Sequence, residues 1–445
     1  STHCISSAAS DVYKRQTQGS IMTAFTRSRS AKILAGVALL SASAIVVAGC
    51  SSTPSEEPSD GGGGGSTADL TLELGSLLPQ TGSLSFLGPP MESGVGLAVK
   101  EVNDAAAGIT INLTAEDEGD TDTKAYETSI SKLQSAGVTA IVGAAASGVS
   151  RLILDGNVSA GILQISASNT GPDFTDWDDN GLYFRTAPSD LLQGEVLGNL
   201  IAEDGHKTLG VIYQNDAYGT GLFENIKSTF ENAGGEVVAD ASYNVGDGQF
   251  DAQVETIKAQ NPDAVAIVSF DQFKTIAPLL VNAGISPDKF YLVDGNLSDY
   301  GSSPDTNFPF SLEGAQGTKP GPALEDDFTD RLQAYWTGEG NPEVNDFTYA
   351  AEAYDAVVLV SLASLAAGST EGADIAAKMA EVSGGTGDGE KCTSFADCAE
   401  IINGGGTADY DGYSGEITFD ENGDPQGASI GTYVYDAENL ISRTN

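Results

Sequence analysis

Hydrophobic and polar positions alternate from residue 70 onward in two series of short β-rich runs and longer helical stretches. In the first series LTLELGSLL, ITINLTAE, VTAIVGAA and ILQIS predict strands, with helices such as ESGVGLAVKEVNDAAA and KAYETSISKLQSAG between them. A second series follows YFRTAPSD, with predicted strands KTLGVIYQND, GEVVADASYN, DAVAIVSF and KFYLVDG. Strands that alternate with helices form parallel sheets covered on both faces. The pattern therefore predicts an α/β protein with two doubly wound parallel-sheet lobes.

The last third of the chain adds helices and two short strands. Apolar spacing predicts helices around 323–336, 346–367 and 374–382. Near the end, YSGEITFD and SIGTYVYD are typical of antiparallel strands joined by the turn ENGDP. Ligands of open α/β sheets bind beyond the carboxyl ends of the strands, so we expect a site at the strand-to-helix turns.

Two of these turns are rich in hydroxyl groups. In VGAAASGVS a strand ends at Gly143, and Ser147 can cap the following helix. The free N–H groups and positive dipole end of that helix would receive a carboxylate without any basic residue. An ordinary N-cap would leave the same pattern. One unit later, ISASNTGPDFT offers the hydroxyls of Ser166, Ser168 and Thr170, and a plain turn is again the alternative.

An apolar run near the N-terminus predicts export. Residues 33–47 contain only Ala, Leu, Val, Ile, Ser and Gly, and the stretch from Met22 to this run carries three basic residues and no acid. Such a stretch is a secretory signal, too short for a comfortable membrane span. Cys50 follows Val-Ala-Gly, which resembles the bacterial lipobox, where the cysteine becomes the mature N-terminus and carries diacylglycerol. An ordinary signal peptide with an incidental cysteine is the alternative.

These features divide the N-terminal region into three expected parts. Residues 1–21 precede the expected start and resemble a translated sequencing adapter, so we treat them as a non-native leader. Residues 22–49 form the lipoprotein signal peptide. Residues 50–68 form a flexible tether, because they contain Ser, Glu, Pro and Gly but no Ile, Leu, Val or aromatic residue.

Charge and rare residues narrow the function. Removing residues 1–49, which contain five basic residues and one acid, leaves 20−5 = 15 basic and 63−1 = 62 acidic residues, a net charge of −47. Such a field repels nucleic acid, so nucleic-acid binding is excluded. His206 is the one histidine left in the mature chain, which gives a Ser–His–Asp triad or a histidine-based zinc site almost no material. We therefore expect no catalytic residue, metal or cofactor, although chemistry by carboxylates alone stays open.

Two cysteines remain besides Cys50. Cys392 and Cys398 lie six residues apart in KCTSFADC. An exported protein meets an oxidising compartment, so a local disulfide is the expected state. The alternative is a metal site, which would require more ligating residues nearby.

The order of the motifs resembles the type I periplasmic-binding-protein-like family, in its Leu/Ile/Val-binding branch of substrate-binding proteins for ABC importers. The resemblance runs from Leu70 to about Tyr435 and is carried by the following strings: LPQTGSLSFLGPPMESGVGLAVKEVN, AIVGAAASGVS, LQISASNTGPDFT, YFRTAPSDLLQG, GVIYQNDAYGTGL and TYAAEAYDAV. It implies a fold of two lobes joined by three crossovers that close on a ligand. On this basis lobe 1 comprises 69–187 and 319–414, and lobe 2 comprises 188–318 and 415–445.

The resemblance also implies a set of ligand-binding residues. In that family the first lobe holds the carboxylate of an amino acid, and the second lobe supplies an aromatic residue and an acid for the ammonium. The matching positions are Leu87, Ala146, Ser147, Ser168, Thr170, Tyr218, Phe270, Gln272 and Asp294. The register at Phe86-Leu87 is open by one residue. Asp294 lies one or two residues from its expected place, which leaves open whether the ligand has an ammonium.

The function implied by the resemblance is capture of a small amino-acid-like solute and its delivery to the permease of an ABC importer. We expect a monomer, anchored through lipid on Cys50 at the outer face of the cell membrane, and no enzyme activity. The alternatives are an amide, urea or aromatic acid as ligand, and a sensing module that acts through a partner.

Overall fold

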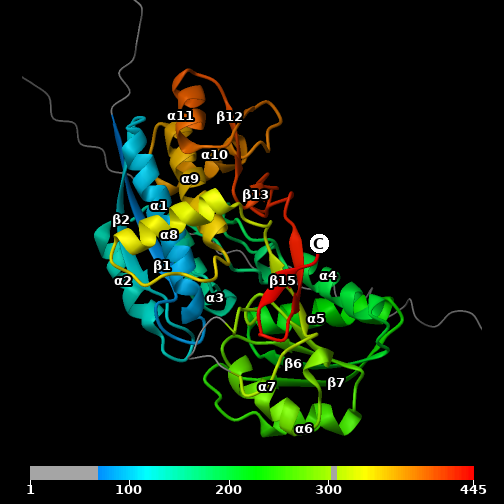
Figure 1. Cartoon of the computed structure of the whole chain (residues 1–445). Helices are drawn as coiled ribbons and strands as arrows, with labels where there is room; N and C mark the ends of the chain where they lie inside the picture. Colours follow the sequence, from blue (N-terminus) through cyan, green and yellow to red (C-terminus); the bar gives the residue numbers. More distant parts are fainter. Residues whose placement is uncertain (1–68, 302–307) are drawn as a thin grey trace, which may run out of the picture. The chain divides into compact units, whose positions relative to one another are not determined.

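Two parallel sheets organise the chain, and each carries helices (Figure 1). The computed structural model describes residues 69–301 and 308–445. The expectations for the leader, the signal peptide, Cys50 and the tether lie outside these residues. The described residues belong to one unit, Gly65–Asn445. The expected α/β fold with parallel sheets is confirmed.

The first sheet has five parallel strands in the order β2-β1-β3-β4-β5. Its strands are β1 (Leu70–Leu78), β2 (Ile109–Asp117), β3 (Ala140–Gly143), β4 (Leu163–Ser166) and β5 (Tyr183–Arg185). The helices that connect them are α1 (Gly88–Ala105), α2 (Ala125–Ala136) and α3 (Ser147–Ala160). Both central strands, β3 and β4, are buried along their whole length, as expected for strands covered on both faces.

A late helix completes the core of this lobe. Helix α9 (Ala350–Ala367) is long and apolar enough to cross a membrane, but it is mostly buried against α1, β1, β3 and β4, so it is a core helix. Gly94 in α1 allows the close approach, since a Cβ there would lie 2.2 Å from the carbonyl oxygen of Ala350. The remaining elements of this lobe are α8 (Asp326–Gly338), α10 (Gly372–Val382), β11 (Glu390–Cys392), α11 (Phe395–Asn403), β12 (Ala408–Gly412) and β13 (Gly415–Glu416).

The second sheet has seven strands in the order β15-β14-β10-β9-β8-β6-β7. The strands are β6 (Thr208–Gln214), β7 (Glu236–Tyr243), β8 (Ala264–Val268), β9 (Phe290–Leu292), β10 (Gln316–Pro320), β14 (Ile430–Tyr435) and β15 (Ile441–Arg443). Its helices are α4 (Asp190–Glu203), α5 (Ala217–Asn232), α6 (Asp251–Gln260) and α7 (Phe273–Asn282). The pairs β10–β14 and β14–β15 are antiparallel, and the other pairs are parallel.

Several local expectations change in the structure. Strand β10 runs to Pro320 in the second sheet, so the crossover follows residue 320 rather than 318. Strand β13 pairs with β12, so the first lobe continues past residue 414. The predicted strands YSGEITFD and SIGTYVYD do not pair with each other. Strand β13 pairs with β12 in the first lobe, whereas β14 lies between β10 and β15 in the second sheet. Cys392 and Cys398 form a disulfide between β11 and α11.

The chain passes between the lobes three times, and one buried ion pair links two of these crossovers. Arg185, at the end of β5, is fully buried. Its Nε and Nη2 donate to the two carboxylate oxygens of Asp424, at 2.5 and 2.9 Å, in the segment between β13 and β14. Its Nη1 donates to the carbonyl oxygens of Gly171 and Asn169, at 2.8 and 3.3 Å. The guanidinium therefore joins the crossovers after β5 and β13 to the loop that follows β4.

Loss of the Asp424 charge should destabilise the protein strongly. The Asp424→Asn variant leaves the buried Arg185 guanidinium without its counter-charge, and removing one partner of a buried pair costs about 3–5 kcal/mol. In urea denaturation we expect the free energy of unfolding to fall by about 3 kcal/mol. The control is Asp104→Asn, at an exposed pair with Lys100, which should cost less than about 1 kcal/mol. Equal effects of the two variants would contradict the structural role of the buried pair.

Candidate functional site

A small cavity lies where strands of both sheets end. Its volume is about 10 Å³, roughly the room for one water molecule and far below the roughly 300–1,000 Å³ of pockets for drug-sized ligands. It is lined by Leu84, Leu87, Ala145, Ala146, Ser147, Ser168, Tyr218, Phe270, Asp294 and Tyr349. Seven of the nine residues implied by the resemblance are in this lining. The structure therefore brings together side chains from four separate strand ends, those of β3, β4, β8 and β9.

The first-lobe wall consists of the loops after β3 and β4. Ser147 is the first residue of α3 rather than its N-cap, which is Ala146, and its Oγ accepts the N–H of Gly171 at 3.2 Å. The Ser168 hydroxyl donates to the carbonyl oxygen of Ala145 at 3.3 Å. These two contacts hold the loops against each other at the cavity.

The N–H groups at the start of α3 are only partly free. Those of Ala145 and Ala146 donate to the two carboxylate oxygens of Glu118, each at 2.7 Å. The amides of Ser147 and Gly148, and that of Thr170 in the neighbouring loop, have no partner among the described residues. Of the three, only Ser147 belongs to the cavity lining, so its N–H group is the donor that the first lobe offers to a bound group.

The second-lobe wall holds a buried carboxylate and two stacked rings. Tyr218 in α5 stacks on Phe270, with ring centroids 5.2 Å apart. The Tyr218 hydroxyl donates to Oδ1 of Asp294 at 2.8 Å, and the Tyr349 hydroxyl donates to Oδ2 at 2.7 Å. Tyr349 directly precedes α9 of the first lobe, so the Asp294 carboxylate bridges the two lobes.

Two implied residues lie outside the lining. The Thr170 hydroxyl donates to Oδ2 of Asp190 at 2.9 Å. The Gln272 side chain folds back on its own turn, where Oε1 accepts the N–H of Phe270 at 3.1 Å. Both side chains support the loops beside the cavity. Conversely, Leu84, Ala145 and Tyr349 line the cavity although they were not predicted.

Asp190 is a further acid that sequence reasoning missed. It is fully buried at the first turn of α4, and its Oδ1 has no partner in the described parts of the chain. Burial and the nearby charge of Asp294 raise its pKa well above the ordinary value. Burial also raises the pKa of Asp294, against the lowering effect of its tyrosine hydrogen bonds. Asp190 and Tyr349 lie in YFRTAPSD and TYAAEAYDAV, two of the sequence segments that carry the family resemblance. The resemblance therefore pointed to these segments but implied no role for either residue.

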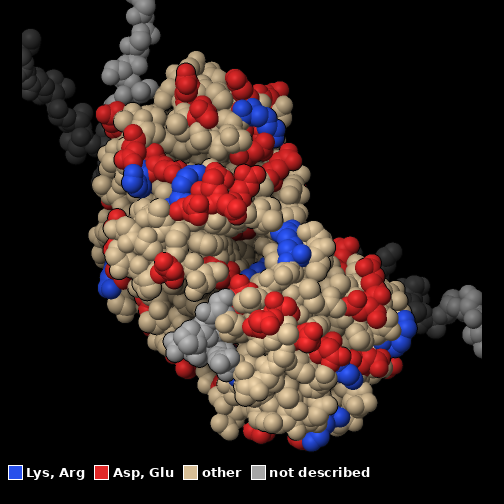
Figure 2. All heavy atoms as spheres, viewed as in Figure 1, with Lys and Arg blue, Asp and Glu red and all other residues tan. Residues whose placement is uncertain are grey.

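The electrostatics of the site are acidic. No Lys or Arg is in the cavity lining, and Arg185 is occupied by Asp424 and main-chain carbonyls. The described residues contain no group of three His, Cys, Asp or Glu side chains that would hold a metal ion. Carboxylates are also spread over the surface in view in Figure 2, with few cationic side chains between them.

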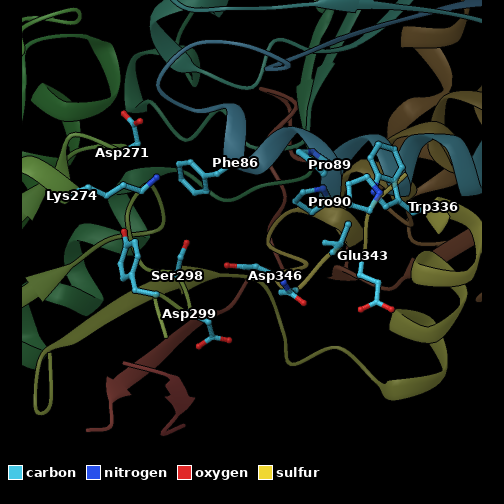
Figure 3. A pocket seen from close by; sticks show the side chains of 14 residues that line it. Phe86, Pro89, Pro90, Asp271, Lys274, Ser298, Asp299, Trp336, Glu343 and Asp346 are labelled. Carbon is cyan, nitrogen blue, oxygen red and sulfur yellow. The ribbon is translucent and has the colours of Figure 1, made fainter. Parts of the chain in front are cut away.

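A larger pocket lies beside this cavity, and it is lined by Phe86 rather than by Leu87. Figure 3 shows Phe86, Pro89 and Pro90 on one wall, with Lys274 facing Phe86. Leu87 belongs to the small cavity, so the two neighbours line different pockets. We place the candidate site in the small cavity, because the strand ends of both sheets converge there.

Comparison with known proteins identifies relatives over most of the chain. A family model described as periplasmic binding protein matches residues 71–397. The leucine-, isoleucine-, valine-, threonine- and alanine-binding protein of Pseudomonas aeruginosa is 30% identical over 196 residues, 43% of this chain and 52% of that one, so the match spans about half of that relative. Leu/Ile/Val-binding protein homolog 1 of Brucella suis is 28% identical over 324 residues, 71% of this chain and 83% of the relative.

Solved structures share the fold. The branched-chain amino acid transporter substrate binding protein of Streptococcus pneumoniae, in complex with isoleucine, matches with a TM-score of 0.66 and 20% identity, over 84% of this chain and 100% of that one. A solute binding protein of an ABC transporter from R. palustris, in complex with benzoate, matches with a TM-score of 0.65 and 19% identity, over 84% of this chain and 96% of that one.

The buried acids should make the protein less stable as the pH rises. Burial raises the pKa of Glu118 and of Glu352 to about 8 in the folded state, from 4.5. The folded state therefore binds more protons than the unfolded state between about pH 4.5 and 8. We expect the free energy of unfolding, measured in urea, to decrease across this window.

The Glu352→Gln variant tests the cause. One titrating group contributes at most about 1.4 kcal/mol per pH unit, so the slope should become shallower by up to this amount. An unchanged slope in the variant would show that Glu352 does not titrate in this range.

Proposed function

The chain belongs to the type I periplasmic binding protein family, in the branch of the Leu/Ile/Val-binding proteins, and from this premise we propose that it captures a small zwitterionic amino acid between its lobes for an ABC importer. Members of this family are substrate-binding proteins rather than enzymes. The finer assignment concerns the ligand, and it rests on the polar groups of the cavity.

The observation that carries the proposal is the separation of donors and acceptors across the cavity. The first lobe offers the free N–H group of Ser147, which lies at the start of a helix and suits a carboxylate. The second lobe offers the Asp294 carboxylate, which suits an ammonium. A zwitterion carries both groups on one carbon atom, so it satisfies both walls together.

Asp190 adds to the preference for an ammonium. Its unpartnered Oδ1 and the charge of Asp294 form a buried acidic region without a cation in the lining. Asp190 does not line the cavity, so a ligand cation would act on it only through its charge, by favouring the ionised form of the two acids. A simple anion such as benzoate has nothing to offer this side of the cavity.

The rest of the lining suits an aliphatic side chain. Leu84, Leu87 and Phe270 present apolar surface, and the lobes must separate for a solute to enter, because the closed cavity has room for about one water molecule. Micromolar affinity corresponds to about 8 kcal/mol, which a few charge-assisted hydrogen bonds of about 1.5–3 kcal/mol each and this apolar contact supply. Relatives named for leucine, isoleucine and valine support the same class.

A calorimetric screen of leucine, isoleucine, valine, urea, amides and benzoate tests the proposal. We expect the branched amino acids to bind most tightly. Preference for benzoate, or for an uncharged amide, would replace the amino acid as ligand. Binding of the same solutes with no importer partner would instead support the alternative of a sensing module.

The Asp294→Asn variant should lose affinity selectively. If Asp294 meets the ammonium, its charge contributes to leucine binding but not to binding of 4-methylpentanoate, which is leucine without the amino group. We expect leucine affinity to fall roughly 10- to 100-fold, as for loss of a hydrogen bond to a charged group, and the affinity for 4-methylpentanoate to change little. Isothermal calorimetry on both ligands gives the ratio.

The matched control is Asp271→Asn, which removes an exposed carboxylate at the next strand end and outside the cavity lining. It should leave both affinities within about twofold of wild type, because an exposed charge contributes little. Equal losses of affinity for the two ligands in Asp294→Asn would show that Asp294 does not bind the ammonium. In a separate test, leucine binding that is not weakened by Ser147→Ala would show that the carboxylate of the solute binds elsewhere.

The N-terminal region supports anchoring of this binding protein outside the cell. Its apolar run is followed by Ala-Gly and Cys50, and we expect the residues after Cys50 to act as a tether. We expect mass spectrometry of the membrane fraction to find diacylglycerol on Cys50, and Cys50→Ser to release unmodified protein or leave it unprocessed. Mature protein that begins at another residue would contradict the anchor.

A further inference from the structure

Glu118 is a buried acid that lies behind the cavity rather than in it. It directly follows β2, at the edge of the first sheet, and its side chain is fully buried. Its own N–H donates to the carbonyl oxygen of Leu78 at 2.9 Å, and its carbonyl oxygen accepts the N–H of Tyr126 at 3.1 Å. The residue is therefore fixed to the end of β1 and to the start of α2.

The carboxylate of Glu118 holds one side of the loop 144–147. Its Oε2 accepts the N–H of Ala145 and its Oε1 accepts the N–H of Ala146, each at 2.7 Å. The two consecutive amides thereby have a fixed direction.

Serine hydroxyls hold the carbonyl side of the same loop. Ser166 and Ser150 donate to the carbonyl oxygen of Ala144, at 2.7 and 3.1 Å, and Ser168 donates to that of Ala145. The loop is thus held from two directions at the point where Ala145, Ala146 and Ser147 line the cavity. Without Glu118, only the carbonyl side would be held.

We propose that Glu118 is a positioning residue for solute binding, which fixes the loop 144–147 so that the free amide of Ser147 at the start of α3 meets the carboxylate of the solute. This inference rests on the proposed function for the identity of the bound group. Glu118 does not itself line the cavity. It takes up the amides of Ala145 and Ala146, and leaves that of Ser147, which lines the cavity, to the solute.

The Glu118→Gln variant changes one oxygen into an NH2 group at nearly constant volume. One of the two loop amides would then face a donor, so one hydrogen bond is lost and the loop is released on that side. The matched control is Glu352→Gln, since Glu352 is the same residue type, is also buried, and lies in α9 away from the loop.

Hydrogen–deuterium exchange of the ligand-free protein tests the anchor without any solute. In Glu118→Gln we expect peptides that cover residues 143–150 to exchange at least tenfold faster, while those from α9 keep their wild-type rate. Ser150→Ala should give a smaller increase in the same peptides, which covers the case in which Glu118→Gln does not fold. Exchange that is unchanged in both variants would overturn the inference.

Binding of two probes distinguishes positioning from general loosening. Leucine carries the carboxylate, whereas 3-methylbutylamine is leucine without it. We expect Glu118→Gln to weaken leucine about tenfold and the amine less than twofold, with Glu352→Gln close to wild type for both. Equal losses for the two probes would overturn the positioning role. If wild type binds neither probe, the proposed function fails, and the exchange experiment still decides whether Glu118 holds the loop.

Discussion

The buried carboxylate of Asp294 needs hydrogen-bond donors, and this need connects the two lobes. A charged group away from water is costly unless it is paired or hydrogen-bonded. Here the donors are two phenols, Tyr218 from the second lobe and Tyr349 from the first. The cavity, the contact between the lobes and the orientation of both rings all follow from this one requirement.

In the proposed function, the first lobe would hold the carboxylate of the solute through hydrogen bonds from the main chain rather than through a cationic side chain. The cavity lining has no cationic side chain, and its proposed anion-binding group is the main-chain amide of Ser147 at the start of α3. Amides attract a carboxylate without a long, mobile side chain to order, so little conformational entropy is lost on binding. The acidic wall then discriminates by the ammonium.

The sequence was sufficient for the order of strands and helices and for the strand ends that form the site, because these follow from local periodicity and from small residues at turns. Side-chain partners were not predictable in this way. Thr170 lies in the expected loop, but its hydroxyl bonds to Asp190, twenty residues away. Glu118 takes up amides 27 and 28 residues later in the chain. YSGEITFD and SIGTYVYD look like a hairpin, yet their strands β13 and β14 do not pair, and β14 lies between β15 and β10, the latter more than a hundred residues earlier. Each miss is a non-local contact that competes with a local pattern.

The position of α9 in the chain has a consequence for the order in which the protein folds. This helix covers β1, β3 and β4, but it begins at Ala350, after nearly all of the second lobe. A chain that emerges from its N-terminus would therefore complete the sheet of the second lobe's parallel strands while the first sheet still lacks part of its cover. Contacts between distant segments slow folding. The first lobe therefore remains incomplete until most of the chain is available, and it is the later of the two lobes to bury its core.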